Sequence, residues 1–404
     1  MLSADAFFQE QAMRTLAHVL YGGADIGECM KTMSRIPPGD KTAWHREWTL
    51  TADRVASIGD ACSRSGHDVS AREAYLRASN YYRTSYLMHY GAPTAQEVLR
   101  GFERESSTFQ AFASRSDPPL EPVEIPYEGT TLPGYFCRAD GAAGHRGTLI
   151  ATNGYDSTVH EMYFAFAAAA TRRGYNCLLF DGPGQGRVLI QQGLTFRPDW
   201  EHVLRAVMDF VLPRPDVEST RVALAGWSFG GYLALRAAGS EHRLAACIAD
   251  PGLSGLWEPL QAMLSGLPAQ ALAQPLEADP SIFAPFMAQV ESSTGLYWKI
   301  VQRAFWAHGV RSLPEYVDLA KHYTNDDAVQ SIRCPVFLAW EESDVLARGV
   351  PDIFARLRAP KTLARFLDTE GAGDHCAMMA RSLFHQRMFD WLDDVLGAVP
   401  APAA

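Results

Sequence analysis

The chain has 404 residues, 47% of them hydrophobic and 20% charged, which are ordinary values for a folded globular protein and exclude a disordered or fibrous one. The length suits one large α/β unit with an added or inserted piece. With 36 basic and 46 acidic residues the formal net charge is −10, which argues against nucleic acid or an anionic membrane as a partner and favours a neutral or apolar small molecule.

Residues 1–117 predict a helical N-terminal domain without a strand pattern. One of its helices is expected from Ser70 to about Tyr90, because Ser70-Ala-Arg-Glu73 fits the capping box at a helix start. This helix is rich in tyrosine. We interpret the rings as a core that docks the helices onto the next domain; the alternative is that some of them wall a pocket. The adjacent prolines at 118 and 119 predict a linker at the end of this domain.

From residue 118 onward, short apolar strands alternate with helical patterns. Eight strands are expected, at Val123–Tyr127, Leu132–Cys137, Gly147–Thr152, Cys177–Asp181, Val222–Ala225, Ala246–Asp250, Pro335–Trp340 and Thr362–Leu367. Helices are expected at Glu161–Arg173, Trp200–Leu212, Phe229–Gly239, Asp352–Arg358 and Met378–Leu396. The strands are apolar on both faces, so the alternation predicts a mainly parallel sheet covered by helices on both sides. Eight strands with a serine after the fifth are typical of the α/β-hydrolase fold.

The interval from Gly252 to about Arg333 interrupts this alternation, because it has no convincing strand and is rich in aromatic residues. An insertion between the sixth and seventh strands lies above the strand ends and would form a helical lid. The rings are either lid core or the lining of an apolar cavity, and we expect several, including Trp257 and Tyr323, to bind substrate. The expected divisions are the helical domain 1–117, the core at 118–252, the lid insertion at 253–333 and the rest of the core at 334–404.

The most informative motif is Gly226-Trp-Ser228-Phe-Gly230, which follows the apolar run Val222–Ala225 and precedes a helical pattern. Strand, sharp turn and helix in this order are typical of a nucleophile elbow with the serine at its apex. Small residues are needed two positions before and after the serine, because a Cβ there would collide with the adjoining strand and helix. The motif predicts Ser228 as a nucleophile; the alternative is a glycine-rich turn with a solvated serine.

A serine hydroxyl attacks poorly until a base takes its proton, so the chain must also supply a histidine and a group that orients it. Of the twelve histidines, only His375 lies in a loop directly after the last expected strand, in Gly371-Ala-Gly373-Asp-His375. We predict His375 as the base. The other histidines, among them His160 and His308, are interpreted as polar surface or pocket-rim residues.

The acid that orients the histidine is expected after the seventh strand, where Trp340-Glu-Glu-Ser-Asp344 supplies three carboxylates. Asp344 is the first choice because it lies furthest along the loop, whereas Glu341 and Glu342 begin too close to the strand. Asp250, after the sixth strand, stays open as an alternative, since some hydrolases take their acid from that position.

The charge that develops on a substrate oxygen needs donors that are already in place. The backbone amide of Phe229, next to the nucleophile, is expected to be one donor of this oxyanion hole. The amide of Tyr155 is expected to be the other, because Gly154 permits a turn in the loop after the third strand. The side chains expected to border the substrate from this segment are Asp156, His160 and Glu161.

The glycine-rich run Asp181-Gly-Pro-Gly-Gln-Gly186 is superficially similar to a dinucleotide-binding loop, but it lacks the third glycine at the required spacing and has proline in the turn. The sequence contains no P-loop motif and no metal-ligand spacing such as H-E-x-x-H. We therefore expect neither a cofactor nor a metal.

The seven cysteines are scattered without C-x-x-C spacing, mostly in apolar runs, which predicts buried free thiols in a reducing compartment. The N-terminal residues include an acid where a signal peptide has a basic region. The longest apolar run, Met162–Ala170, is too short to cross a membrane. We expect a cytoplasmic protein with no membrane partner.

Several motifs together resemble one branch of the α/β hydrolases: Asn153-Gly-Tyr-Asp-Ser157, Asp181-Gly-Pro-Gly-Gln-Gly186, Arg197-Pro-Asp-Trp-Glu201, Gly226-Trp-Ser-Phe-Gly-Gly231 and Gly371-Ala-Gly-Asp-His375. This branch includes 2,6-dihydroxypseudooxynicotine hydrolase, the fungal yellowish-green heptaketide hydrolase and fermentation-respiration-switch-like proteins. The likeness spans about residues 40–395. It implies the α/β-hydrolase fold, a triad of Ser228, His375 and Asp344, and a homodimer. It also implies attack on the carbonyl of an aryl ketone or β-diketone, followed by loss of a stabilised carbanion.

The first hypothesis is a serine-dependent hydrolase that cleaves a carbon–carbon bond next to a ketone in a bulky aromatic or polyketide-like substrate. The second is an esterase, thioesterase or acyl-transferring cyclase on a similar substrate, because the same oxyanion hole serves these reactions. The third is a small-molecule-binding protein without turnover, and the complete set of serine, histidine and aspartate counts against it. The aromatic-rich lid and N-terminal domain favour an apolar, ring-containing ligand.

Overall fold

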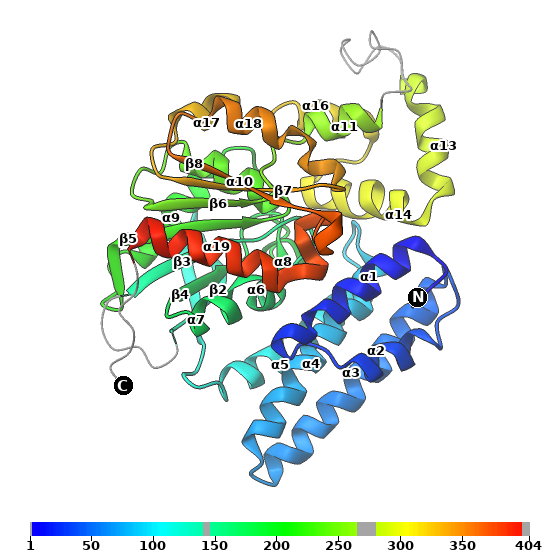
Figure 1. Ribbon diagram of the computed structural model, residues 1–404. Coiled ribbons are helices and arrows are strands. Elements are labelled where there is room, and N and C mark those ends of the chain that lie inside the picture. The colour runs from blue at the N-terminus through cyan, green and yellow to red at the C-terminus, as the bar shows by residue number, and fades with distance from the viewer. Residues whose placement is uncertain (1, 140–145, 265–279, 398–404) are drawn as a thin grey trace.

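The computed structural model describes residues 2–139, 146–264 and 280–397 of the chain. Within these ranges, a twisted sheet with helices on both faces forms the centre of the molecule (Figure 1). Two helical regions, one at the N-terminus and one inserted later in the chain, lie together at one end of this sheet (Figure 1). Both regions are therefore beside the strand ends from which the predicted serine and histidine loops start.

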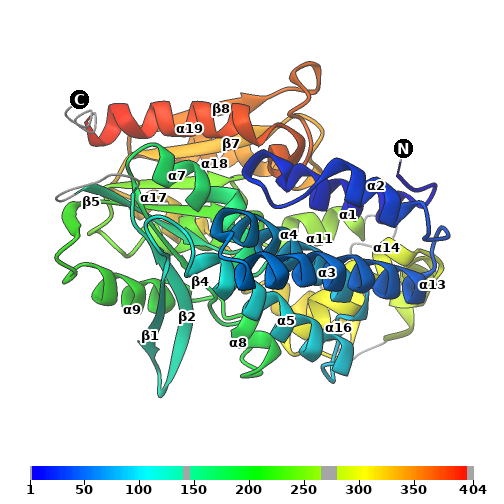
Figure 2. The ribbon, with the colours of Figure 1, turned by 90° about the horizontal axis from the view of Figure 1, so that it is seen from below.

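The N-terminal region consists of helices only: α1 Ala6–Ala17, η1 His18–Tyr21, α2 Ile26–Met33, α3 Lys41–Arg64, α4 Asp68–Tyr86, η2 Leu87–His89 and α5 Gln96–Ala113. Helices α3, α4 and α5 pack side by side (Figure 2). The expected helix start at Ser70 is wrong, since α4 begins at Asp68 with His67 as its N-cap. The reason is the tight turn after α3, in which Gly66 has a φ of +74° and the next helix resumes two residues later.

The tyrosines from α4 to the end of η2 are buried, as their interpretation as a docking core requires; they are Tyr75, Tyr81, Tyr82, Tyr86 and the following Tyr90. Tyr90 extends this core to the inserted helices, because its ring is stacked on Trp298 with the centroids 5.8 Å apart. Helix α1 packs both on this helical group, where Phe8 contacts Trp44 of α3 and Thr15 is hydrogen-bonded to Thr84 of α4, and against the segment that begins with His375.

All eight expected strands are present: β1 Glu121–Tyr127, β2 Thr130–Cys137, β3 Arg146–Thr152, β4 Asn176–Phe180, β5 Val217–Trp227, β6 Ala246–Asp250, β7 Val336–Glu341 and β8 Lys361–Phe366. The largest difference from the expected bounds is in β5, which begins five residues before Val222. Its first half contains polar residues and therefore gives no apolar signal in the sequence.

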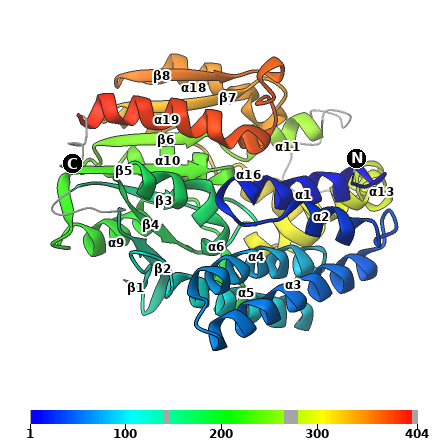
Figure 3. The ribbon, with the colours of Figure 1, turned by 60° about the horizontal axis from the view of Figure 1, so that its bottom comes forward.

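The strands form one sheet in the order β1-β2-β4-β3-β5-β6-β7-β8 (Figure 3). The pairs β1–β2 and β2–β4 are antiparallel and every other neighbouring pair is parallel, so the mainly parallel α/β-hydrolase sheet predicted from the sequence is confirmed. Thr152 of β3 pairs with Gly226 of β5, and Trp227 pairs with Asp250 of β6. The loop after β3, the turn after β5 and the end of β6 therefore begin side by side.

Helices cover the sheet on both faces, and the strand side chains alternate between two hydrophobic cores. Ile150 belongs to one core, while its neighbours Leu149 and Ala151 belong to the other. The core helices are α6 Val159–Met162, η3 Tyr163–Ala167, α7 Ala168–Arg172, α8 Gly186–Ile190, α9 Glu201–Val211, α10 Phe229–Ala238, α17 Asp326–Ser331, η6 Val345–Gly349, α18 Val350–Arg356, η7 Asp368–Glu370, η8 His375–Ala380 and α19 Arg381–Leu396. Helices α6, η3, α7 and α19 supply one core, and α9 and α10 supply the other.

Between β6 and β7 the chain inserts a region, here called the lid, that reaches to the end of α16; α17 after it packs on α10 of the core. The described part of the lid is helical: α11 Trp257–Met263, η4 Pro280–Phe283, α13 Ala284–Ser292, α14 Thr294–Tyr297, η5 Trp298–Ala304, α15 Phe305–His308 and α16 Leu313–Ala320. Segments α14, η5 and α15 follow one another without a break, and η5 is a π-helical stretch. This helix begins after Ser293, whose hydroxyl caps it, and ends at Gly309 with a φ of +69°. No helix in the described ranges is long and apolar enough to cross a membrane.

Candidate active site

Ser228 lies at a sharp turn between β5 and α10, in a backbone conformation that few residues other than glycine adopt. Its φ and ψ are +59° and −124°. The turn is held by two hydrogen bonds: Ser228 N–H donates to the carbonyl of Asp250 at 2.6 Å, and Gly231 N–H donates to the carbonyl of Ser228 at 2.8 Å. Strain of this kind persists only where the surroundings impose it, and it is typical of functional turns.

The glycines around the serine are required by close backbone packing. A Cβ at Gly226 would lie 1.9 Å from the carbonyl oxygen of Gly230, and one at Gly230 would lie 2.6 Å from the carbonyl oxygens of Thr152 and Asn153. Backbone atoms cannot move aside as a flexible side chain can. The crossing of strand, turn and helix is therefore possible only with glycine at both positions.

Three side chains predicted from the sequence form a hydrogen-bonded chain. Ser228 Oγ lies 2.8 Å from His375 Nε2, and His375 Nδ1 lies 2.6 Å from Asp344 Oδ2. Asp344 is almost fully buried, whereas 40% of the His375 side chain remains accessible, so the imidazole faces open space beside the serine. An arrangement of this kind can move a proton from a serine hydroxyl to an imidazole.

The charges around His375 favour the protonated form of its imidazole. Partial removal from water lowers the pKa of His375, but the charge and hydrogen bond of Asp344 outweigh this effect, and Asp250 and Asp156 raise the pKa further, so it lies above its usual 6.5. Burial raises the pKa of Asp344, but the charge and hydrogen bond of His375 keep it below its ordinary value. The pair therefore stabilises an imidazolium that has just received a proton.

Asp250, the alternative acid, is not hydrogen-bonded to His375. Its Oδ2 accepts a hydrogen bond from Arg381 Nη1 at 2.6 Å, and both side chains are buried. Its Oδ1 and both oxygens of Glu341 lack a conventional donor among the described residues. The two carboxyl groups face each other from neighbouring strands, so a shared proton is the donor that both need. Burial raises the pKa of both groups, and that of Glu341 strongly.

The loop after β3, here called the β3 loop and comprising residues 153–158, passes directly over the serine. A Cβ at Gly154 would lie 3.0 Å from Ser228 Cβ and 3.5 Å from the amide nitrogen of Phe229. This contact brings the backbone of the β3 loop next to the first turn of α10. The two residues whose amides are expected to form an oxyanion hole, Tyr155 and Phe229, therefore belong to adjoining segments.

The Asp181–Gly186 motif supports this loop from below. Gln185 Nε2 donates to the carbonyl of Asn153 at 2.7 Å, and Asn153 Nδ2 donates to Asp181 Oδ1 at 3.2 Å and to the carbonyl of Ser157 at 2.8 Å. Burial raises the pKa of Asp181 to about 6. The glycine-rich run that superficially resembles a nucleotide loop thus positions the β3 loop.

An aromatic layer lies over the elbow and joins it to the lid. The ring of Phe229 packs against Tyr155, Phe196 and Tyr323, with centroid distances of 4.8, 5.1 and 5.9 Å. The hydroxyl of Tyr155 is hydrogen-bonded to His308 Nε2, and the hydroxyl oxygen of Tyr323 lies 3.2 Å from His308 Nδ1. His308 was expected at the surface or a pocket rim, but it is buried, and burial lowers its pKa to about 3.

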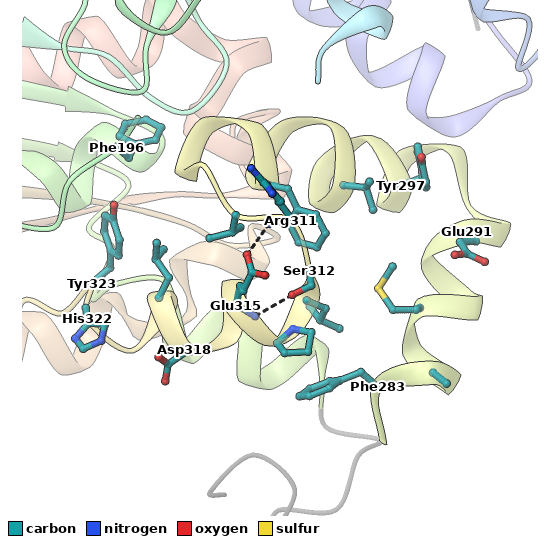
Figure 4. A pocket seen from close by; sticks show the side chains of 18 of the residues that line it. Phe196, Phe283, Glu291, Tyr297, Arg311, Ser312, Glu315, Asp318, His322 and Tyr323 are labelled. Carbon is teal, nitrogen blue, oxygen red and sulfur yellow. Dashed lines mark hydrogen bonds between the residues drawn. The ribbon is translucent and has the colours of Figure 1, made fainter. Parts of the chain in front are cut away.

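A cavity of about 1070 Å³ extends from this layer into the lid. Phe196 and Tyr323 lie at one end of it, and Tyr297 and Glu291 lie at the other (Figure 4). Other lining side chains are mainly apolar, among them Met287, Val301, Phe305 and Leu313. Phe196 and Tyr323, which line one end of the cavity, also contact the ring of Phe229, the residue directly after Ser228.

The remaining predicted site residues are distributed differently. Asp156 forms ion pairs with Arg14 and Arg303, and these arginines gave no signal in the sequence because their partners are 142 and 147 residues away. Glu161 and His160 are both buried against N-terminal helices: Glu161 forms an ion pair with Arg14 of α1, and His160 Nδ1 lies within hydrogen-bond distance of Glu105 of α5, at 2.9 Å from Oε1.

Trp257 lies at the start of α11, half-buried, with the ammonium of Lys321 5.6 Å from its ring centroid. It takes no part in the ring contacts around Phe229.

Within the described ranges, no group of three or more His, Cys, Asp or Glu side chains is arranged to hold a metal ion. All seven cysteines are free thiols, and six of them are buried.

The sheet order, the elbow and the serine–histidine–aspartate contacts define an α/β hydrolase. The alpha/beta hydrolase family model matches residues 141–386, and the chain belongs to this family. It is 33% identical to hydrolase acrC of Aspergillus aculeatus and 30% identical to 20-hydroxy-prefusarin hydrolase FUS2 of Gibberella moniliformis, each over 96% of both chains. The crystal structure of 2,6-dihydroxy-pseudo-oxynicotine hydrolase shares the fold, with a TM-score of 0.73 and 24% identity over 96% of this chain and 98% of that one. The resemblance found in the sequence motifs is confirmed.

Proposed function

We propose that this α/β hydrolase uses Ser228, His375 and Asp344 to hydrolyse a carbon–carbon bond next to a ketone in a bulky, ring-containing substrate of aromatic or polyketide type. The observation that carries the proposal is the hydrogen-bonded chain from Ser228 Oγ to His375 Nε2 at 2.8 Å and from His375 Nδ1 to Asp344 Oδ2 at 2.6 Å. The amides of Tyr155 and Phe229 form the oxyanion hole.

In the first step, Ser228 Oγ bonds to the ketone carbon and its proton passes to His375 Nε2. The carbonyl oxygen becomes an oxyanion that the two amides stabilise. The carbon–carbon bond then breaks, and the leaving carbon takes its electron pair as a stabilised carbanion and receives the proton from His375. Water attacks the resulting acyl-serine, again with His375 as the base, and releases the carboxylic acid. In the water-assisted variant, His375 activates a water that attacks the ketone directly.

The substrate class is supported by the cavity in the lid. A volume of about 1070 Å³ with mainly apolar walls accommodates a molecule of several rings. One of its lining residues, Phe196, packs on the ring of Phe229 next to the nucleophile. The 30% identity to a relative named as the hydrolase of 20-hydroxy-prefusarin supports a small organic substrate. Binding roles for Asp156, Trp257 and Tyr323 remain part of this proposal.

The nucleophile is tested with a fluorophosphonate probe. The expected result is one covalent adduct, located on Ser228 by peptide mass spectrometry, and no adduct on the Ser228→Ala variant. The matched control is Ser240→Ala, a serine at the far end of α10 that leaves the elbow unchanged. A wild-type protein that stays unlabelled would favour a binding protein over an enzyme.

The bond type is tested by comparing an aryl β-diketone with a set of p-nitrophenyl esters. Carbon–carbon hydrolysis predicts a higher kcat/KM for the diketone, with formation of one carboxylic acid and one ketone in equal amounts. The same relay and oxyanion hole also suit an ester or thioester. Turnover of the esters alone would replace the first proposal with an esterase or acyl-transferring enzyme.

A further inference from the structure

Asp156, in the β3 loop, is held from two sides by arginines that belong to different parts of the molecule. Arg14 of α1 donates from Nη1 to Oδ1 at 2.7 Å, and Arg303 of the lid donates from Nη1 to Oδ2 at 2.7 Å. Each carboxylate oxygen thus has its own guanidinium partner. Burial opposes ionisation, but the two arginines hold the pKa of Asp156 far below its usual range, so the carboxylate is charged at any working pH.

Arg14 is a rigid partner because the other two nitrogens of its guanidinium are also bound. Its Nε and Nη2 donate to the two oxygens of Glu161 at 2.8 and 2.6 Å. Glu161 lies in α6, the helix that directly follows the β3 loop, and its side chain is also paired with Arg83. Arg14 therefore ties the two ends of this short segment together and lies with its guanidinium carbon 5.6 Å from the ring centroid of Trp227, next to the elbow.

Arg303 is the partner from the lid, and it contacts two consecutive residues of the β3 loop. Besides its ion pair with Asp156, its guanidinium carbon lies 4.6 Å from the ring centroid of Tyr155. The Tyr155 hydroxyl is hydrogen-bonded to His308 and lies 3.1 Å from that of Tyr316. Arg303 lies in the π-helical stretch η5, a local irregularity that is frequent at functional sites.

These contacts matter because the amide between Gly154 and Tyr155 is the oxyanion donor of the proposed function. Gly154 packs over the serine, while Tyr155 and Asp156 are held through their side chains by the lid. The direction of the Tyr155 N–H depends on the position of both neighbours. An oxyanion donor must be fixed to a fraction of an ångström, and a misplacement of about 1 Å costs about 100-fold in rate.

We propose that Arg303 is a positioning residue for the oxyanion hole: it clamps Tyr155 and Asp156 against Arg14, so that the hole is complete only while the lid is docked on the β3 loop. The inference rests on the proposed role of the Tyr155 amide. It assigns to the lid a second task besides enclosing substrate, because lid opening would release the donor and closure would restore it.

The test is the Arg303→Gln variant, which removes the ion pair between the lid and Asp156 and leaves the Arg14–Glu161 pair in place. The probes are phenylboronic acid and a fluorophosphonate, because both form a tetrahedral adduct on Ser228 whose oxygen occupies the oxyanion hole. We expect phenylboronic acid to bind about 10- to 100-fold more weakly and labelling to slow by the same factor. For an ester that the wild type hydrolyses, kcat should fall by this factor with KM nearly unchanged.

The matched control is Glu10→Gln. Glu10 also joins α1 to η5, through an ion pair with Lys299 at 3.1 Å, but it does not contact the β3 loop. Its removal should leave probe binding and labelling unchanged. The Asp156→Asn variant removes the carboxylate that Arg303 binds. The double variant Arg303→Gln, Asp156→Asn should therefore lose little more probe affinity and labelling rate than either single variant. Thermal unfolding of each variant separates this result from loss of the folded state.

The outcomes separate this inference from the function on which it rests. Equal probe affinity and labelling in wild type and Arg303→Gln would overturn the inference alone. A raised KM with unchanged kcat would also overturn it, because Arg303 would then contact substrate. An equal loss in Glu10→Gln would assign the effect to general docking of α1 on the lid. A wild-type protein that reacts with neither probe would overturn the proposed function together with the inference.

Discussion

His375 Nδ1 lies 2.6 Å from Asp344 Oδ2, although the two residues are 31 positions apart and belong to loops that follow different strands. The contact fixes the ring so that Nε2 points at Ser228 Oγ. It also leaves Asp250, the other carboxylate considered for this position, in a buried ion pair with Arg381. The geometry thus favours Asp344, the first choice from the sequence, over the alternative Asp250.

Removing the hydroxyl of Ser228 or the imidazole of His375 should abolish turnover without unfolding the protein. We expect Ser228→Ala and His375→Ala to lower kcat by about 10⁴ to 10⁶, as in other serine triads. The melting temperature should change little, because neither side chain fills a core. Steady-state kinetics and thermal unfolding on the same samples check this. Activity within tenfold of wild type in either variant would contradict the proposed mechanism.

The two candidate acids should behave differently when each is changed to asparagine. Asp344→Asn should lower kcat by about 10⁴, because the amide favours the wrong imidazole tautomer. Asp250→Asn should keep most of kcat but lower the free energy of unfolding by at most about 3 kcal/mol, because Glu341 can lose its proton and replace part of the counter-charge of Arg381. Kinetics and urea unfolding distinguish the two. A larger kcat loss in Asp250→Asn would reverse the assignment.

The pH dependence should report the raised pKa of His375. A base must be neutral to accept a proton, so kcat/KM should fall as pH drops through this pKa, with a midpoint above 6.5. In Asp344→Asn the carboxylate that raises the pKa is gone while the burial that lowers it remains, so the midpoint of the residual activity should move to lower pH. A wild-type midpoint below 6.5, or no shift in the variant, would be inconsistent with this electrostatic account.

The buried Glu341–Asp250 pair should make the protein less stable as pH rises. Glu341 keeps its proton in the folded state, whereas in the unfolded chain it loses it near pH 4.5. Above that pH the unfolded state gains about 1.4 kcal/mol per pH unit until the folded pKa is reached. Glu341→Gln retains a donor for Asp250 and does not titrate. The variant's free energy of unfolding should therefore rise relative to wild type between pH 5 and pH 8, as measured by urea unfolding; a constant difference would mean that Glu341 is ionised.

Local patterns were sufficient for the sheet and for the central part of the site. Most strands of the core contain a short apolar run, and the glycines around Ser228 mark the elbow, so the presence of the eight strands and the position of the serine follow from neighbouring residues. The start of α4 shows the limit of such patterns. Ser70 fits a capping motif, but the turn at Gly66 starts the helix two residues earlier.

Contacts between distant residues were not predictable in this way. Asp156 was expected to border substrate, yet its position is set by Arg14 and Arg303, which are 142 and 147 residues away. His308 was expected at the surface or at a pocket rim, and its burial depends on the packing of the lid against Tyr155. Neither arginine differs locally from a surface arginine.

The succession of strands and helices along the hydrolase core, the turn that exposes Ser228, and the loops that hold a histidine and an acid could be read from the sequence, because these depend on periodicity and on backbone sterics within a few residues. The folded structure was needed to exclude Asp250 as the partner of His375 and to find the arginines that fix the β3 loop. Ion pairs and hydrogen bonds of buried groups depend on distances across the fold, and those distances are set only when the N-terminal helices and the lid pack against the same end of the sheet.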